Sequence, residues 1–256
     1  MTQVFGHEKL IVYQKAMRFA AIRTALLERL PRRVAACDHL ERAAESILVN
    51  IAHASSAWSA RERIVCLGHA NGSALECAAC LDVFVAKTLL STEAVYPGKG
   101  LLAEVVCMLI AMRKTAANRV CEEQAVYRTK KGRLFDHEDL EVYQAALQLL
   151  GWLESMWNVF ACSADLRTKL DKSTTSIALN IAEGNGRFTG NEQVSFYATA
   201  YRATIQSASL IDLATAGGVA DAVHVDVGRE LLHRIAAMLT ALSKAISKAE
   251  RSASDT

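Results

Sequence analysis

The chain has 256 residues, of which 52% are hydrophobic and only 2 are Pro. This length suits one large domain or two ordinary ones. Few helix breakers and few β-branched runs favour helices and argue against a sheet protein. The formal net charge of +2 does not by itself indicate a nucleic-acid partner.

Positive charge is concentrated in the first half of the chain. Residues 1–130 hold 17 Lys and Arg against 12 Asp and Glu, whereas residues 131–256 hold 12 against 15. If the protein meets a polyanion, the first half is the better candidate for the contact.

Several classes of protein are disfavoured. No uninterrupted apolar run reaches 18 residues, so we expect no membrane span. The N-terminal stretch MTQVFGHEKL lacks the layout of a signal peptide. The 7 Cys are odd in number, and six of them lie within residues 1–130. This distribution indicates reduced thiols in a cytoplasmic protein rather than a secreted disulfide framework.

An internal repeat with a constant offset of 130 residues organises the chain. FGHEKLIVYQ at 5–14 matches FDHEDLEVYQ at 135–144, and SILVNIA at 46–52 matches SIALNIA at 176–182. Roughly a hundred residues align without an insertion, which indicates a tandem duplication. We therefore expect a first module at 1–114, a linker at 115–134 whose start could prolong a helix, a second module at 135–250, and a frayed tail at 251–256.

Each module carries four stretches with apolar residues every three or four positions. In the first module the pattern begins over 10–27 and continues over 40–51; in the second it covers 140–157, 166–181, 196–213 and 231–246. This spacing is typical of amphipathic helices. Helices of about 20 residues with short connections pack as antiparallel neighbours. The predicted fold is all-α, with two tandem up-and-down antiparallel four-helix bundles.

The stretch NIAEGNGR at 180–187 has two interpretations, a phosphate-binding loop or a helix end. A phosphate loop follows a strand, whereas the preceding residues have helical period. We expect Gly184 to end the second helix in a left-handed conformation. Thr189 and Glu192 then fit a capping box for the third helix, as Ser59 begins one in the first module. Arg187 stays a candidate contact residue.

Asn50 and Asn180 each follow a Ser by one turn, Ser46 and Ser176 respectively. A buried Asn must find hydrogen-bond partners. We expect a structural hydrogen bond between helices; the alternative is that these Asn residues set helix register or an oligomeric interface.

Metal binding and catalysis are disfavoured by spacing. Cys77 and Cys80 suggest a metal with Cys66 and His69, but in one continuous helix Cys66 and Cys77 lie about 16 Å apart. Buried thiols are the simpler interpretation. His7 and His137 suit turns before the first helix of each module. Because no Ser-His-Asp order, Walker sequence or His-Glu-x-x-His occurs, we expect no enzyme, no cofactor, no metal and no small-molecule substrate.

Basic residues supply the candidate nucleic-acid contacts, with a merely solvated face as the alternative. Phosphate contacts of this kind would be independent of sequence and sensitive to salt. The candidates gather near the end of the first helix and in the linker, with one at the signature stretch: Arg18, Arg23, Arg29, Arg32, Arg33, Lys130, Lys131, Arg133 and Arg187.

Three motifs together resemble a known family. They are LxVYQ at 10–14 and 140–144, SIALNIAEGNGR at 176–187, and ANGSALE at 70–76. The chain is similar to the four-helix-bundle proteins encoded in 23S rRNA intervening sequences, and to the accessory variability determinant of diversity-generating retroelements. The resemblance implies a small bundle that forms cyclic oligomers with a basic surface. In the retroelement branch it implies binding of a reverse transcriptase and nucleic acid.

The two copies divide the family motif between them. The second keeps NIAEGNGR at 180–187 but has AYRATIQ at 200–206, whereas the first keeps ANGSALE and loses the other motif after Ala52. The sequence thus leaves two functions open. One is a non-enzymatic accessory protein that binds RNA or DNA, together with a reverse transcriptase. The other is a self-associating protein–protein scaffold with no nucleic-acid role and no membrane contact.

Overall fold

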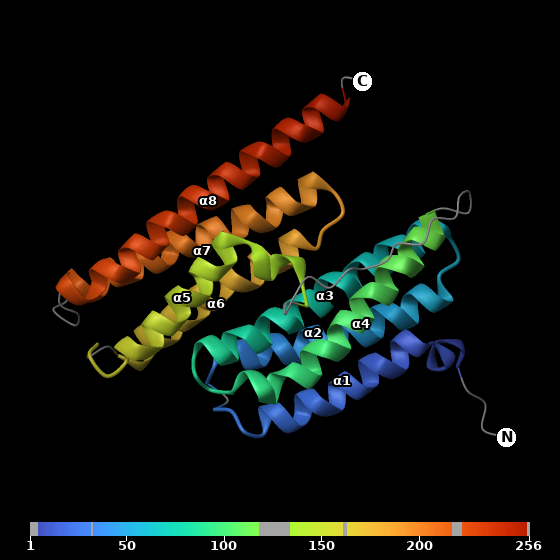
Figure 1. Ribbon diagram of the computed structural model, residues 1–256, viewed down its shortest axis with the longest axis horizontal. Coiled ribbons are helices and arrows are strands. Elements are labelled where there is room, and N and C mark those ends of the chain that lie inside the picture. The colour runs from blue at the N-terminus through green and yellow to red at the C-terminus, as the bar shows by residue number, and fades with distance from the viewer. Residues whose placement is uncertain (1–4, 32, 118–133, 161–162, 217–221, 255–256) are drawn as a thin grey trace.

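The computed structural model describes residues 5–31, 33–117, 134–160, 163–216 and 222–254. Within these ranges the chain is all-α and forms two antiparallel four-helix bundles, which confirms the predicted fold class (Figure 1). The first bundle contains α1 (Ile11–Leu27), α2 (Ala35–Ser56), α3 (Ala60–Ala86) and α4 (Thr92–Ala117). The second contains α5 (Glu141–Met156), α6 (Ala164–Asn185), α7 (Gly190–Ala216) and α8 (Ala222–Ser254).

Short 3-10 helices introduce the two bundles, η1 (Gly6–Lys9) and η2 (Asp136–Asp139). Glu8 accepts a hydrogen bond from the backbone N–H of Phe5 at 2.8 Å, and Glu138 accepts the equivalent bond from Phe135. The side-chain bonds that close the turns predicted around His7 and His137 therefore come from the neighbouring Glu8 and Glu138.

The caps predicted between the second and third helices are confirmed. Ser59 accepts from the Glu62 N–H at 3.1 Å, and Thr189 accepts from the Glu192 N–H at 3.3 Å. These side chains satisfy backbone donors that the first helical turn leaves unpaired. The turn that joins these helices is thus built alike in both modules.

The prediction for Gly184 is wrong. α6 continues through Asn185, and Gly186 is the capping residue with a right-handed φ of −86°. Gly184 is buried inside the helix, where a Cβ atom would lie 2.8 Å from Cε1 of Tyr197. Close packing of α7, rather than a left-handed backbone, is what requires a glycine at this position.

The predicted bond between helices from Asn50 and Asn180 is also wrong. Each Asn side chain is half-buried and donates to the carbonyl of the Ser one turn earlier, at 2.8 Å for both Ser46 and Ser176. The link to the next helix comes instead from Ser73, whose hydroxyl lies 2.8 Å from the Ser46 hydroxyl. A polar chain across α2 and α3 thus exists in the first module.

The module ends differ slightly from the expected boundaries. α4 ends at Ala117, so residues 115–117 prolong a helix, and residues 118–133 of the linker lie outside the described residues. α8 continues to Ser254, four residues into the segment expected to fray. By length and composition alone, α3 and α4 are long and apolar enough to cross a membrane; 61% and 39% of their most apolar windows are buried in the bundle.

Candidate functional site

The two modules meet along α3 of the first and α6 of the second, with further contacts of α5 on α3 and α6 on α2 (Figure 1). At one end of this junction the two halves of the family motif come together. The Asn71 side-chain amide donates to the carbonyl of Gly186 at 3.1 Å. A Cβ atom at Gly72 would lie 2.8 Å from Nη2 of Arg187. Each module has therefore kept the part of the family motif that contacts the other module: ANGSALE in the first and NIAEGNGR in the second.

Arg187 is held in the junction by two interactions. Its guanidinium forms an ion pair with Glu183 one turn earlier, and it lies over the ring of Phe196 at 4.4 Å from the centroid. Burial raises the pKa of the Glu183 carboxyl, while the charge of Arg187 works in the opposite direction. Arg187 was predicted to contact phosphate, but its side chain is only 11% exposed and is paired inside the protein.

A second polar cluster lies farther along the junction and joins α3, α4, η2 and α5. The Tyr143 hydroxyl donates to Asp82 at 2.9 Å across the modules. Lys99 pairs with Asp82 at 2.6 Å and with Glu138 of the other module. Burial disfavours the charged form of Lys99, but the two carboxylates outweigh it and raise the lysine pKa. Burial is also the main cause of the raised pKa of Asp82. These residues line a pocket of about 270 Å³.

A buried ion pair lies at the other end of the junction. Lys87, at the end of α3, is 2% exposed, and its ammonium lies 2.5 Å from a carboxylate oxygen of Asp171 on α6. The second Asp171 oxygen accepts from the Ala35 N–H at 2.8 Å. Both oxygens of the half-buried carboxylate thus have a partner, which offsets the cost of removing its charge from water.

His137 is a strongly perturbed titratable group of the junction. Its ring lies between Phe135 and Tyr143, with centroid distances of 5.5 and 4.7 Å. Neither ring nitrogen has a hydrogen-bond partner among the described residues. Burial, assisted by the nearby charge of Lys99, lowers the pKa of His137 to about 3. The ring is therefore neutral at physiological pH.

Those of the predicted basic residues that the structure describes do not form one cluster. Arg18, Arg29 and Arg33 are exposed on α1 and in the turn that follows it. Arg23 is half-buried and donates to Thr24 at 3.2 Å. Arg32, Lys130, Lys131 and Arg133 lie outside the described residues.

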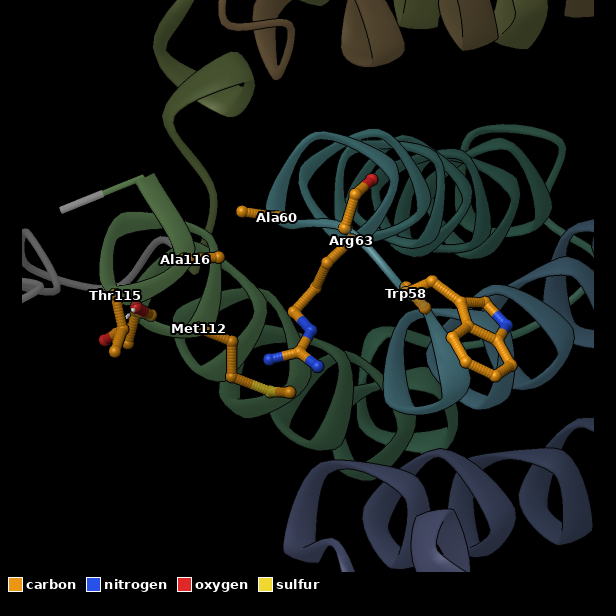
Figure 2. Close-up of a pocket in the computed structure, with 9 residues that line it drawn as sticks. Trp58, Ala60, Arg63, Met112, Thr115 and Ala116 are labelled. Carbon is orange, nitrogen blue, oxygen red and sulfur yellow. Dashed lines mark hydrogen bonds between the residues drawn. The ribbon is translucent and has the colours of Figure 1, made fainter. Parts of the chain in front are cut away.

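A shallow groove of about 550 Å³ lies at the end of the first module, between the start of α3 and the end of α4. Figure 2 shows Arg63 and Met112 reaching into the opening, while the Trp58 ring points away from it. Trp58 is completely exposed. Arg63 donates to the Ala54 carbonyl at 3.1 Å, which fixes its position at the wall.

Four cysteines of the first module, Cys66, Cys77, Cys80 and Cys107, are free thiols. Cys77 and Cys80 are fully buried, and burial raises the pKa of both thiols well above the usual value. Because α3 is continuous from Ala60 to Ala86, Cys66 is held three turns away. The described part of the chain contains no group of three His, Cys, Asp or Glu side chains that could hold a metal ion.

The structure defines the class of this protein as a tandem fusion of two four-helix bundles, which contact each other through the two halves of one sequence motif. Comparison of the sequence with known families agrees: the family model described as 23S rRNA-intervening sequence protein matches residues 8–111 and again residues 138–241. The chain belongs to this family and contains two copies of its domain. No curated protein and no solved structure matches the chain.

Proposed function

We propose that the chain is a non-enzymatic accessory protein that binds RNA or DNA along α1 of the first module. The observation that carries the proposal is that Arg18, Arg29 and Arg33 are exposed and make no ion pair with any residue that the structure describes. The neighbouring cation on the same helix, Lys15, is instead paired with Glu104. Free guanidinium groups on one helix and its following turn suit contacts with phosphates.

The excess of basic residues in the first half of the chain supports the same module as the binding surface. Such binding would not depend on base sequence, because phosphate contacts carry none of that information. The basic residues near the end of the linker, Lys130, Lys131 and Arg133, remain candidates from the sequence.

The proposal is tested with the variant Arg18→Glu/Arg29→Glu/Arg33→Glu and a labelled single-stranded or duplex oligonucleotide. Three phosphate contacts on a duplex predict that affinity falls roughly fortyfold between about 50 and about 200 mM salt. The matched control Arg234→Glu/Lys244→Glu/Lys248→Glu makes the same change of net charge at exposed positions of α8. Loss of binding in the first variant alone supports the proposal, whereas equal loss in both, or binding insensitive to salt, contradicts it.

We propose a reverse transcriptase as the protein partner, on the resemblance to the retroelement accessory protein. Co-elution of the purified chain with a purified retroelement reverse transcriptase tests this point. The proposed cytoplasmic location is supported by the free thiols of Cys66, Cys77 and Cys80.

A protein–protein scaffold is the second candidate function. It is favoured by the apolar side chains that the chain exposes on α2 and α7, among them Val49, Ile205 and Leu213. The salt titration separates the two functions, because a scaffold with no nucleic-acid role shows no oligonucleotide binding at any salt concentration.

A further inference from the structure

The groove at the end of the first module marks a place where the two copies of the domain differ. It lies between the start of α3 and the end of α4, and its volume is about 550 Å³. The equivalent place in the second module lies between the start of α7 and the end of α8. A comparison of these two places shows what the groove lacks.

In the second module the last turns of α8 cover the start of α7. A Cβ atom at Gly190 would lie 2.7 Å from Cγ2 of Ile246 and 2.5 Å from Cδ of Glu250. The Glu250 carboxylate also accepts a hydrogen bond from the backbone N–H of Asn191 at 3.1 Å. An apolar side chain and, one turn later, a carboxylate therefore occupy this place.

The first module has neither of these two side chains. Ala116 stands 130 residues before Ile246 and lines the groove. The position equivalent to Glu250 is Val120, which lies outside the described residues and carries no carboxylate. The residue equivalent to Asn191 is Arg61, whose backbone N–H belongs to the first turn of α3 and lacks the carboxylate acceptor that Asn191 has.

The groove instead contains a cation. Arg63 stands at the position of the neutral Gln193. Its Nε donates to the Ala54 carbonyl at 3.1 Å, and Figure 2 shows the side chain reaching into the opening. No carboxylate of the described residues pairs with this guanidinium. Because Arg61 and Lys114 nearby in the sequence are also exposed, the groove favours an anionic occupant.

Most of the remaining lining is apolar. Methionine is an adaptable contact residue, and alanines allow another backbone to come close. A nucleic-acid backbone is held by several cations, whereas Arg63 is the one cation among the described lining residues. This combination favours a peptide segment that carries a carboxylate beside apolar side chains. The apolar lining residues are Ala57, Ala60, Ala111, Met112 and Ala116.

One difference between the modules limits how closely an occupant can approach. Ala60 stands at the position of Gly190, so its Cβ atom takes up space that Ile246 and Glu250 use in the second module. An occupant therefore lies farther from α3 than α8 lies from α7. The longer side chain of Arg63, compared with Gln193, reaches across this added distance.

We propose that the groove binds an acidic amphipathic helix of a partner protein. The helix places an apolar side chain against Ala116 and Met112, and a carboxylate one turn later on the Arg63 guanidinium. This arrangement supplies the two groups that Ile246 and Glu250 supply in the second module. A charge-assisted hydrogen bond to a guanidinium fixes the direction of the bound helix, and apolar contact supplies the remaining affinity. The interaction goes beyond the proposed nucleic-acid contact and does not use the arginines of α1.

The test is fluorescence anisotropy of a labelled synthetic peptide titrated with the full chain. The peptide has the sequence of residues 235–250 with Lys244→Glu and Lys248→Glu, so it presents Ile246 and Glu250 on an acidic helix. The unaltered chain binds this peptide. The variant Arg63→Gln, which introduces the residue of the second module, weakens binding by about tenfold or more. A second peptide that also carries Ile246→Asp does not bind.

A matched pair of protein variants locates the binding site. Ala111→Glu adds a carboxylate at an exposed position of the groove and prevents binding by repulsion. The control Ala241→Glu makes the same change at the equivalent exposed position of α8 and binds the peptide as the unaltered chain does. Circular dichroism melts confirm that each variant folds.

Three results would overturn the proposal. The first is an unaltered chain that does not bind the acidic peptide at about 1 mM. The second is binding that Ala111→Glu leaves unchanged, or that Ala241→Glu weakens equally, because the peptide would then bind outside the groove. The third is an oligonucleotide that loses affinity in Arg63→Gln while the peptide does not bind, because the groove would then hold phosphate.

Discussion

The Arg187 guanidinium of the second module packs on the backbone of Gly72 in the first, where no side chain intervenes. Arg187 and Gly72 lie 115 residues apart in the sequence and belong to two motifs that different copies of the repeat have retained. The contact between these two residues explains why each module has kept a different part of the family motif. A residue type is kept where it faces the other module and is replaced where that partner is missing.

Replacement of Gly186 by Ala should destabilise the protein by about 1–3 kcal/mol, because the new Cβ atom would overlap Cδ1 of Leu75 in the packed junction. Urea unfolding measures the loss. The control Gly68→Ala lies on α3 with no atom within 4 Å of the added Cβ, so it should instead stabilise by up to about 1 kcal/mol.

A second substitution makes this prediction specific. Leu75→Ala alone should cost about 2–5 kcal/mol through the cavity it leaves. Combined with Gly186→Ala it should cost less than the sum, because the Cβ atom at 186 occupies space that Leu75 has vacated. Strict additivity of the two free energies would show that these residues do not share a contact.

Replacement of Lys87 by Met should cost about 3–5 kcal/mol, since it leaves the Asp171 carboxylate, which is only 13% exposed, without its cation. The double variant Lys87→Met/Asp171→Asn should be more stable than Lys87→Met alone. The amide carries no charge and still accepts the hydrogen bond from the Ala35 N–H. Chemical denaturation of the three proteins checks the order, and a double variant less stable than the single one argues against the ion pair.

The lowered pKa of the buried His137 leads us to expect that the protein loses stability in acid. Its folded pKa of about 3 lies below the ordinary value of 6.5, so the unfolded chain binds more protons between these limits. Stability is therefore full above 6.5 and falls as the pH is lowered through this window, by about 2 kcal/mol between pH 6.5 and about pH 5.

The variant His137→Phe isolates this contribution. A phenyl ring suits the space between Phe135 and Tyr143 and carries no unpaired nitrogen. Burial raises the pKa of Asp82 and of Glu183, which opposes the His137 effect in the same window, but both carboxyls remain in the variant. Urea midpoints at two pH values should show a shallower acid loss in the variant. Identical pH dependence in both proteins would be incompatible with a neutral buried His137.

The fold could be predicted because apolar spacing, caps and the repeat all indicate the same four helices in each module. Where prediction failed, tertiary contacts outweighed local pattern. Gly184 looks like a helix stop, yet α6 continues through it, and the glycine instead makes room for Tyr197 of α7. Asn50 looks like a link between helices, yet the nearest acceptor is the carbonyl of Ser46 in its own helix.

The junction could not be predicted from apolar periodicity, because the spacing within one helix does not show which of its faces packs against a helix of another module. One signal was present. The first module keeps one part of the family motif and the second module keeps the other part. Each module has lost the part that does not contact the other module. His137 and Lys87 carried no comparable signal, because their burial follows from tertiary packing that local sequence pattern does not show.

The most direct test of the junction is gel filtration of the full chain after cleavage at a protease site placed between residues 118 and 133. If Arg187, Gly186 and Lys87 join the modules as described, the two halves remain together after cleavage, and the variant Gly186→Ala/Lys87→Met releases them. Separation of the halves in the otherwise unaltered chain would contradict the account.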